Sequence, residues 1–401
     1  MFKSALPGFR DFYPQELAER AFIMATWRDV ARRYAFVEYD GPPLEPLDLY
    51  TKKSGDEIVG QLYNFVDKGG REVALRPEMT PTVARMVAAR ANALRKPVRW
   101  FSMPQLFRYE RQQKGRLREH YQLNVDIFGS SDVAADAELV ACAVDIMRAF
   151  GLTSADVVAR VSDRRILQAF LESLRVPSAS IEGVYGVVDK LERTPAEVSA
   201  EKLAGLGVPA ESITRIITIA DVDLAEIESR LASTPASEHV AEFAAFLRYV
   251  NTLLGGDAAW LRVDLSIVRG LAYYTGIVFE LFDRTGEFRA ICGGGRYDSL
   301  LQSLGGADMP ALGFGMGDVV LGELLRAKGL MRAEESRADY WVAGDDGFSL
   351  DRIMREAARL RAQGHSVEYA LRAQSLSKQK KAAHASGAHT FVTLSTDDTN
   401  G

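Results

Sequence analysis

The amino-acid sequence predicts an α+β fold, in which a strand-rich region is interrupted by helices and followed by a small α/β module. Residues 1–175 mix helical and strand patterns, and residues 176–255 carry alanine, leucine and glutamate at helical spacing. Residues 256–330 return to strand-like runs broken by glycine clusters. We therefore expect residues 176–255 to be a helical insertion into one domain. Three independent domains in a row would give the same pattern, and composition leaves both open.

The last part of the chain, residues 338–401, reads as strand, helix, strand, helix and strand. This alternation predicts a small α/β module with a parallel sheet. Residues 351–385 contain eight Lys/Arg and three Asp/Glu, so they are a candidate for docking an RNA backbone. A solvated amphipathic helix face is the alternative.

The composition of the 401-residue chain excludes several classes of protein. Two cysteines, Cys142 and Cys292, are too few for a disulfide framework or a cysteine-based zinc site. The sequence contains no run of about 18 apolar residues, the length that a membrane-spanning helix needs. The first residues lack the apolar core of a signal peptide, so we expect a cytoplasmic protein. The net charge of −5 means that any nucleic-acid contact must use local basic patches.

The most informative segment is residues 107–129, which reads as two strands joined by a long charged loop. Five basic residues, beginning with Arg108, gather in and beside this loop. Guanidinium groups suit bidentate recognition of phosphate and carboxylate. A charge run alone is usually a solvated hairpin tip. Here Glu110, Gln122 and Asp126 add polar groups on the strands themselves, which indicates a site built on a rigid platform.

This hairpin resembles motif 2 of the class II aminoacyl-tRNA synthetases, and in particular that of the histidyl-tRNA synthetase family. Further segments resemble other motifs of the same family: Leu-Pro-Gly-Phe-Arg-Asp at 6–11, Leu-Arg-Pro-Glu-Met-Thr at 75–80, Ile-Val-Arg-Gly-Leu-Ala-Tyr-Tyr-Thr-Gly at 267–276 and Ile-Cys-Gly-Gly-Gly-Arg-Tyr-Asp at 291–298. Each motif is weak alone, but their order between residues 6 and 326 is specific.

The resemblance implies an antiparallel six-stranded sheet flanked by helices. Residues 1–175 and 256–330 would be the two parts of the catalytic core, and residues 338–401 a short α/β domain of the anticodon-binding kind. Residues 36–46 resemble motif 1, which forms a dimer interface in the family, so we expect a two-fold homodimer.

The resemblance also implies the activity of a histidine–tRNA ligase. Such an enzyme uses ATP and Mg²⁺ to activate L-histidine to histidyl-adenylate, and then transfers the histidyl group to the 3′ end of histidine tRNA. The alternative is a histidine-sensing regulatory subunit of ATP phosphoribosyltransferase, which shares the catalytic fold and aminoacylates nothing. The intact motif 2 loop and the C-terminal module, which that subunit usually lacks, favour the ligase.

The implied reaction needs no nucleophile from the protein, because the histidine carboxylate attacks the α-phosphate of ATP. The protein must align two anions and stabilise the transition state. The resemblance implies the following residues: catalytic, Arg108 and Arg269; histidine-binding, Glu78, Thr80, Gln122, Asp126, Arg269, Tyr273, Tyr274, Gly293 and Gly294; ATP-binding, Arg108, Glu110, Arg116, Gly315 and Gly317; tRNA-binding, Arg111, Gln112, Gln113 and Lys114; Mg²⁺ contact, Asp126.

Structural roles are the alternatives for several of these residues. Arg269 also fits an ion pair in a glycine-bounded turn, and Glu78 and Asp126 also fit cross-strand pairs with arginines. Adjacent tyrosines such as Tyr273 and Tyr274 are more often core packing when no motif surrounds them.

Two positions depart from the family pattern. The family's motif 3 ends in an arginine that reaches the γ-phosphate of ATP, whereas residues 317–322 read Gly-Asp-Val-Val-Leu-Gly, and Ala272 replaces the usual aspartate. Plant organellar-type members of the family share both changes. Losing a charged phosphate contact costs about 1.5–3 kcal/mol. Arg116 and Arg289 are candidates for the missing charge, and the sequence does not choose between them.

Overall fold

The computed structural model describes residues 4–51, 59–110, 115–268, 273–333, 337–345 and 349–395. The chain forms two compact units, Met1–Arg332 and Ala333–Gly401. No helix in these described ranges is long and apolar enough to cross a membrane.

The larger unit is built on a sheet whose six central strands are all antiparallel to their neighbours, as the sequence predicted. In spatial order these strands are β5 (Val98–Ser102), β7 (Glu119–Phe128), β12 (Ala311–Gly317), β11 (Cys292–Arg296), β10 (Ile277–Asp283) and β8 (Val157–Asp163). The sequence did not predict the short strands added around them: β1 (Val37–Glu38) and β9 (Leu261–Val263), parallel at the two edges, and β6 (Gln105–Phe107), paired with β7.

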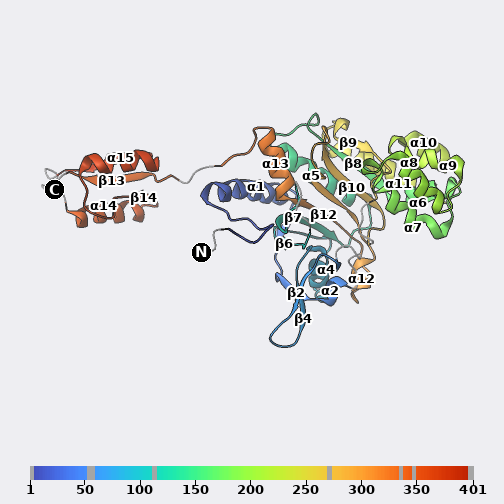
Figure 1. Ribbon diagram of the computed structural model, residues 1–401, viewed down its shortest axis with the longest axis horizontal. Helices are drawn as coiled ribbons and strands as arrows, with labels where there is room; N and C mark the ends of the chain where they lie inside the picture. The colour runs from blue at the N-terminus through green and yellow to red at the C-terminus, as the bar shows by residue number, and fades with distance from the viewer. Residues whose placement is uncertain are drawn as a thin grey trace. The chain divides into compact units, whose positions relative to one another are not determined.

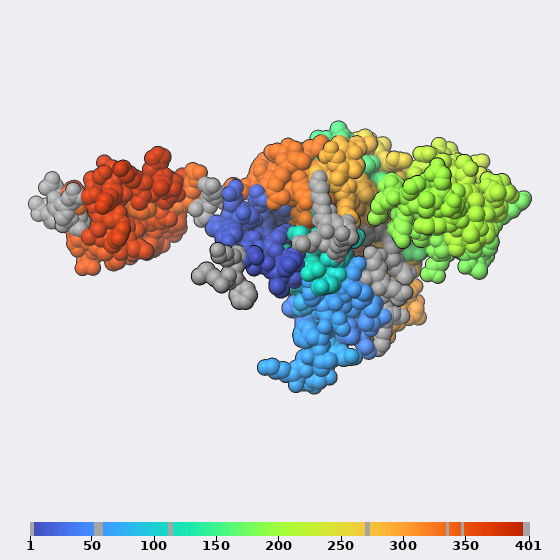
Figure 2. Space-filling view, viewed as in Figure 1, coloured from blue at the N-terminus to red at the C-terminus, as the bar shows by residue number. Residues whose placement is uncertain are grey.

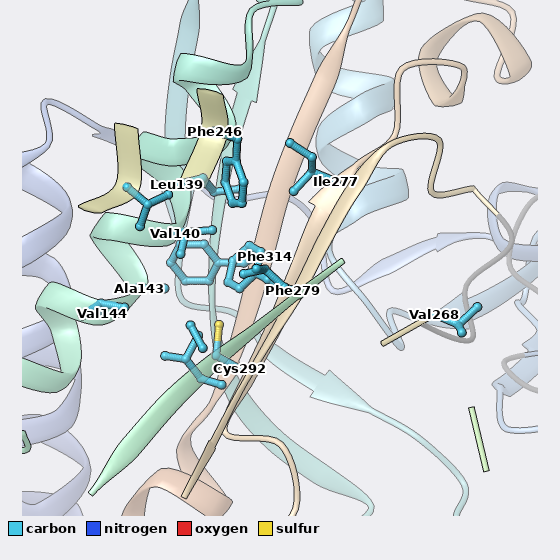
Figure 3. Close-up of a cluster of buried hydrophobic side chains, with 14 of the residues drawn as sticks. Leu139, Val140, Ala143, Val144, Phe246, Val268, Ile277, Phe279, Cys292 and Phe314 are labelled. Atoms are coloured by element: carbon cyan, nitrogen blue, oxygen red, sulfur yellow. The ribbon is translucent and has the colours of Figure 1, made fainter. Parts of the chain in front are cut away.

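The two faces of this sheet differ sharply, because side chains alternate between faces along each strand. On β12, Leu312, Phe314 and Met316 belong to the main hydrophobic core, whereas the alternate positions Gly313 and Gly315 carry no side chain. Figure 3 shows this core, in which helix α5 (Val133–Ala149) supplies a row of apolar side chains packed against the strands. The opposite face is therefore available for a site.

Helices cover the apolar face, and smaller elements pack near one end of the other face (Figure 1). With α5, the apolar face carries α1 (Pro14–Arg33) and α13 (Asp318–Ala327). The other face carries α4 (Thr80–Ala89) and α12 (Leu300–Ser303). Helix α4 is preceded in the chain by α2 (Asp48–Thr51) and by a three-stranded sheet of β2 (Leu44–Pro46), β4 (Glu72–Leu75) and β3 (Tyr63–Val66).

A run of helices connects β8 with the next strands of the same sheet. Its elements are α6 (Arg164–Ser173), η1 (Ser178–Ser180), α7 (Ile181–Val188), η2 (Leu191–Arg193), α8 (Ala196–Gly205), α9 (Ala210–Ile217), η3 (Ile219–Asp221), α10 (Leu224–Leu231), α11 (Ser237–Leu253) and η4 (Ala258–Trp260). Figure 2 shows most of this segment, in green, gathered into one body. Because β8 and β10 are neighbours in the sheet, we propose residues 176–255 as an insertion into the core.

The smaller unit has the parallel three-stranded sheet that the alternating pattern predicted. Its order is β14 (Val367–Glu368), β13 (Tyr340–Gly344) and β15 (Thr390–Leu394), with helices α14 (Leu350–Ala362) and α15 (Leu376–Ser386). Buried Gln379 of α15 exchanges hydrogen bonds with the backbone of Gly344, which ties the helix to the end of β13.

Candidate active site

A pocket of about 1200 Å³ lies on the open face of the large sheet. Its floor comes from alternate positions of β7 and from glycines of β11 and β12. Its walls include the hairpin before β7 and, from the helical run, the end of α7 and η2. Most of the residues that the motifs singled out line it: Glu78, Thr80, Arg108, Glu110, Arg116, Gln122, Tyr273, Tyr274, Gly293, Gly315 and Gly317.

The remaining sequence-predicted residues lie elsewhere. Asp126 is not among the lining residues: it is buried on the pocket face of the sheet, beside Gly313 and Tyr297. Gly294 faces the apolar side of the sheet, where an added Cβ would lie 2.7 Å from the Phe314 Cα. Arg269 and the loop residues Arg111, Gln112, Gln113 and Lys114 lie outside the described residues.

Arg108 is held in place by the backbone. Its Nε donates to the Pro77 carbonyl oxygen at 2.9 Å, and its own N–H donates to the Arg118 carbonyl oxygen at 2.9 Å. The Pro77 contact joins the hairpin to the Leu-Arg-Pro-Glu-Met-Thr segment. With Nε occupied, the two Nη groups are the donors that remain for a ligand in the pocket.

One end of the pocket is lined by aromatic rings and a buried carboxylate. The Tyr273 hydroxyl donates to Glu78 Oε2 at 3.2 Å, and Glu78 is 4% exposed. Tyr273 also contacts Tyr274 and Tyr297, with ring centroids 4.9 Å and 5.7 Å away. This arrangement suits a flat ring that carries a cationic group.

Asp126 closes the same end. Its Oδ1 accepts a hydrogen bond from the Tyr297 hydroxyl, while its Oδ2 has no hydrogen-bond donor among the described residues. Burial raises the pKa of Asp126 to about 7, although the hydrogen bond from Tyr297 acts in the opposite direction. A fully buried carboxyl with one free oxygen can accept a hydrogen bond from a ligand.

His120 faces the pocket from β7, near the glycine strand β12. Burial, together with the charges of Arg108 and Arg10, lowers the pKa of His120 to about 3. The imidazole is therefore neutral at physiological pH, so it offers the pocket an uncharged aromatic face beside two arginines.

Comparison with known proteins identifies this arrangement. The family model described as "Histidyl-tRNA synthetase" matches residues 8–317. The chain belongs to the histidyl-tRNA synthetase family. It is 44% identical over 399 residues to the histidine–tRNA ligase of Opitutus terrae, covering 98% of this chain and 91% of the relative.

Two other members of the family are informative. The chloroplastic/mitochondrial histidine–tRNA ligase of Arabidopsis thaliana is 40% identical, covering 92% of this chain and 75% of the relative. The crystal structure of histidyl-tRNA synthetase from Nostoc sp. PCC 7120 matches the fold with a TM-score of 0.83 at 24% identity, covering 99% of this chain and 92% of that one.

Asp318, in the stretch expected to form the end of motif 3, is held by the N-terminal segment. This residue follows the glycine strand, is 5% exposed and accepts hydrogen bonds from Arg10 at 2.8 Å and from the Tyr121 N–H at 2.9 Å. Arg10 also donates to Glu119 at 2.6 Å. The Leu-Pro-Gly-Phe-Arg-Asp segment is thereby fastened to the start of β7.

Sequence reasoning missed several pocket residues. Tyr297 was quoted within its motif but given no role, although its place four residues after the pocket glycine Gly293 was a usable signal. Arg160, Glu192 and Arg193 also line the pocket. Glu192 and Arg193 belong to the helical run, and only the tertiary fold brings them here.

Proposed function

We propose that this chain is a histidine–tRNA ligase that forms histidyl-adenylate and transfers the histidyl group to the 3′ end of histidine tRNA. The observation that carries the proposal is the grouping of side chains in one pocket. Glu78 and the tyrosines form one group, Arg116 and Arg289 form another group near Glu110, and Arg108 contacts Pro77, one residue before Glu78. This grouping matches a cationic amino acid placed next to a polyphosphate.

The histidine end would use the groups that surround Glu78. Glu78 and Thr80 would receive the ammonium group, and Tyr273 and Tyr274 would contact the imidazole ring. The following groups complete the proposed histidine site: the Gln122 amide, the free Oδ2 of Asp126, the backbone of Gly293, and, from the motifs alone, Gly294 and Arg269.

The ATP end would use Arg108, Glu110, Arg116 and the glycines of β12. A Cβ at Gly315 would lie 2.8 Å from the Gln122 Cδ, so only glycine leaves room for a base to approach the strand there. Gly315 and Gly317 would together form the surface against which the adenine base lies. Arg108 would contact the α-phosphate and the histidine carboxylate together, and so hold the attacking oxygen close to phosphorus. Arg269 would approach the α-phosphate from the opposite side.

The pocket fits Mg²⁺ only as a partner of the phosphates. Within the described ranges, no group of three or more His, Cys, Asp and Glu side chains could hold a metal ion. Mg²⁺ usually binds through phosphates, water and one or two carboxylates. Glu110 is the best-placed carboxylate, since it lies beside Arg116. Asp126 is a poorer donor, because its pKa is about 7 and Tyr297 already occupies one oxygen. Bound Mg²⁺ would neutralise phosphate charge.

Three further assignments are part of the proposal. The loop residues Arg111, Gln112, Gln113 and Lys114 would meet the tRNA, and the protein would act in the cytoplasm. It would also form a two-fold homodimer through the motif 1 region, where β1 is an edge strand and the Val37 and Leu44 side chains are 62% and 37% exposed. Multi-angle light scattering would give twice the mass of 44.2 kDa, and a monomer would contradict the dimer.

The test of the proposed activity is histidine-dependent ATP–pyrophosphate exchange, followed by charging of histidine tRNA. We expect exchange in the parent protein and its loss in Arg108→Ala and Arg269→Ala. Arg71→Ala is the matched control, because Arg71 pairs with Asp67 on the surface, away from both the pocket and the motif 1 region. Absence of exchange, with histidine binding retained in calorimetry, would favour the regulatory-subunit alternative. The curated ligases cover nearly the whole chain, including the C-terminal unit, which supports the ligase.

A further inference from the structure

Helix α13 contributes Val319, Val320 and Glu323 to the lining of the pocket, and no arginine. The first turn of α13 carries Asp318, which Arg10 occupies, and Val320, which is 9% exposed and packs in the main hydrophobic core. An aliphatic side chain there cannot offset phosphate charge. If ATP binds as proposed, its terminal phosphates must meet cations from other elements.

Arg289, on the segment that leads into β11, lies next to this position. An ideal Cβ at Gly115 would lie 3.3 Å from the Val320 Cγ2 and 3.8 Å from the Arg289 Cδ. The Arg289 stem therefore runs beside Val320 and beside the hairpin that carries Arg116. All four of these residues line the pocket.

Arg289 shares the pocket lining with two other arginines, Arg116 and Arg193. Burial, and then repulsion from Arg116 and Arg193, lower the pKa of Arg289, while Glu110 acts in the opposite direction. Arg116 is paired with Glu110 at 2.8 Å. Arg193 makes no ion pair with any described carboxylate and is exposed at the pocket. Glu323 also lies here, with its Oε2 3.9 Å from the ideal Cβ of Gly115, so the positive charges are partly compensated. An anion between the guanidinium groups would relieve the repulsion that remains.

The helical run positions Arg193 through its neighbour Glu192. The Glu192 Oε1 lies 2.5 Å from the Arg160 Nη2, and the Arg160 Nε donates to Asp264 at 2.7 Å. Arg160 is 7% exposed and Asp264 is fully buried. This ion-pair chain fixes η2 against β8, so the backbone that carries Arg193 is attached to the core of the enzyme.

We propose that Arg289 and Arg193, together with Arg116, bind the β- and γ-phosphates of ATP and the pyrophosphate product, with the helical run supplying one wall of this site. The inference rests on the proposed function. It assigns the charge missing from motif 3 to two residues, one of them in the insertion. Glu192 and Arg160 are positioning residues, because they act through Arg193 and touch no phosphate.

The test compares pyrophosphate with AMP in Arg289→Ala, Arg193→Ala and the double variant, using the full-length protein. We expect the KM for ATP and the Kd for inorganic pyrophosphate to rise about 10- to 100-fold in each single variant, the range for losing a charged hydrogen bond. The Kd for AMP, which lacks these phosphates, and the KM for histidine should stay within twofold. Arg289→Lys should recover part of the loss.

A surface variant and a positioning variant complete the design. Arg248→Ala, at an exposed position of α11, should leave all four constants unchanged. Glu192→Gln should raise the KM for ATP by less than Arg193→Ala does, and should add little in the Arg193→Ala background. Circular dichroism would verify that every variant folds.

The outcomes separate the two proposals. Folded Arg289→Ala and Arg193→Ala variants with unchanged constants for ATP and pyrophosphate would overturn the phosphate site while leaving the ligase intact. An equal rise for AMP and pyrophosphate would also overturn it, because that pattern indicates general damage to the pocket. Absence of exchange in the parent would instead remove the proposed function, and pyrophosphate binding by calorimetry would still test the arginines.

Discussion

Tyr297 donates its hydroxyl hydrogen to the buried carboxyl of Asp126, and the second oxygen of that carboxyl has no hydrogen-bond donor among the described residues. Both side chains are almost fully buried. A buried acid with one free oxygen is costly to a fold unless a ligand completes its hydrogen bonds. The pair therefore links the stability of the protein to its proposed binding of histidine.

The first prediction concerns the free energy of unfolding that is lost by burying the carboxyl group of Asp126. Its pKa of about 7 in the folded protein exceeds the ordinary value of 3.8, so the neutral form is favoured in the fold. The contribution of the protonated Asp126 side chain to the free energy of unfolding is complete at low pH and is lost as pH rises towards 7. The neutral variant Asp126→Asn has no such loss. Between pH 5 and pH 8 its free energy of unfolding should improve relative to the parent by ~3 kcal/mol.

Denaturant unfolding of both proteins at the two pH values, without histidine, measures this difference. Taking the difference between the variant and the parent at each pH removes the contribution of every other titrating group that behaves alike in the two proteins. A difference that does not change with pH would mean that Asp126 ionises normally in the folded state.

The hydroxyl of Tyr297 gives the second prediction. Tyr297→Phe removes the donor that lowers the pKa of Asp126, so the carboxyl should become protonated at a higher pH. We expect the KM for histidine to rise about 10-fold at pH 7.5, the effect of about one hydrogen bond, with little change in the KM for ATP. In the parent this KM should rise as pH falls through 7, and in the variant the rise should begin at higher pH.

Tyr34→Phe is the matched control for Tyr297→Phe. Tyr34 also donates to a carboxylate, Asp145, at 2.7 Å, but it does not line the pocket. Its loss should affect stability and leave the histidine KM unchanged. Equal effects of the two variants on the histidine KM would argue against a specific role for Tyr297.

The family resemblance implied the six-stranded sheet, and the motifs that carry it included many of the residues that line the pocket. The alternation of Leu312, Phe314 and Met316 with glycines shows which face of β12 is apolar. The order of motifs indicated the residues that gather on the other face, such as Glu78 and Arg108. These features follow from side-chain period and from family resemblance.

Other features depend on tertiary contacts that no local pattern encodes. Arg193 resembles any exposed helix residue in sequence, and only the Glu192–Arg160 ion pair brings it to the pocket. Likewise, the sequence predicts a motif 3 without its arginine, but it gives no sign that Asp318 is tied to Arg10, 308 positions earlier in the chain.

The partners of Arg10 give the third prediction. Arg10 neutralises Glu119 and Asp318, whose side chains are 1% and 4% exposed. Removing it in Arg10→Ala leaves two buried carboxylates without a cation, which should cost about 3–5 kcal/mol of unfolding free energy. Burial already raises the pKa of Asp318, and Arg10 opposes that rise. The loss should therefore be larger at pH 8 than at pH 5, where the freed carboxyls can take up protons.

Thermal or denaturant unfolding at both pH values measures this loss. Arg28→Ala is the control, because the Arg28–Glu38 pair is more than one-third exposed on both sides and should contribute at most about 1 kcal/mol. Similar losses for the two variants would show that the Arg10 cluster is as well solvated as a surface pair.

The last prediction concerns Gly294. The motif and the structure give different reasons why this position is a glycine. The motif implies a close approach to histidine, whereas the structure turns the position towards Phe314, where a Cβ would lie 2.5 Å from the Phe314 Cβ. Gly294→Ala should therefore force β11 and β12 apart and cost at least ~2 kcal/mol of unfolding free energy in the absence of histidine. Gly186→Ala, in helix α7 with open space around its Cβ, should instead stabilise the protein by about 0.5–1 kcal/mol. If Gly294→Ala kept the parent's stability and only raised the histidine KM, the motif's explanation would hold and the strand-packing one would fail.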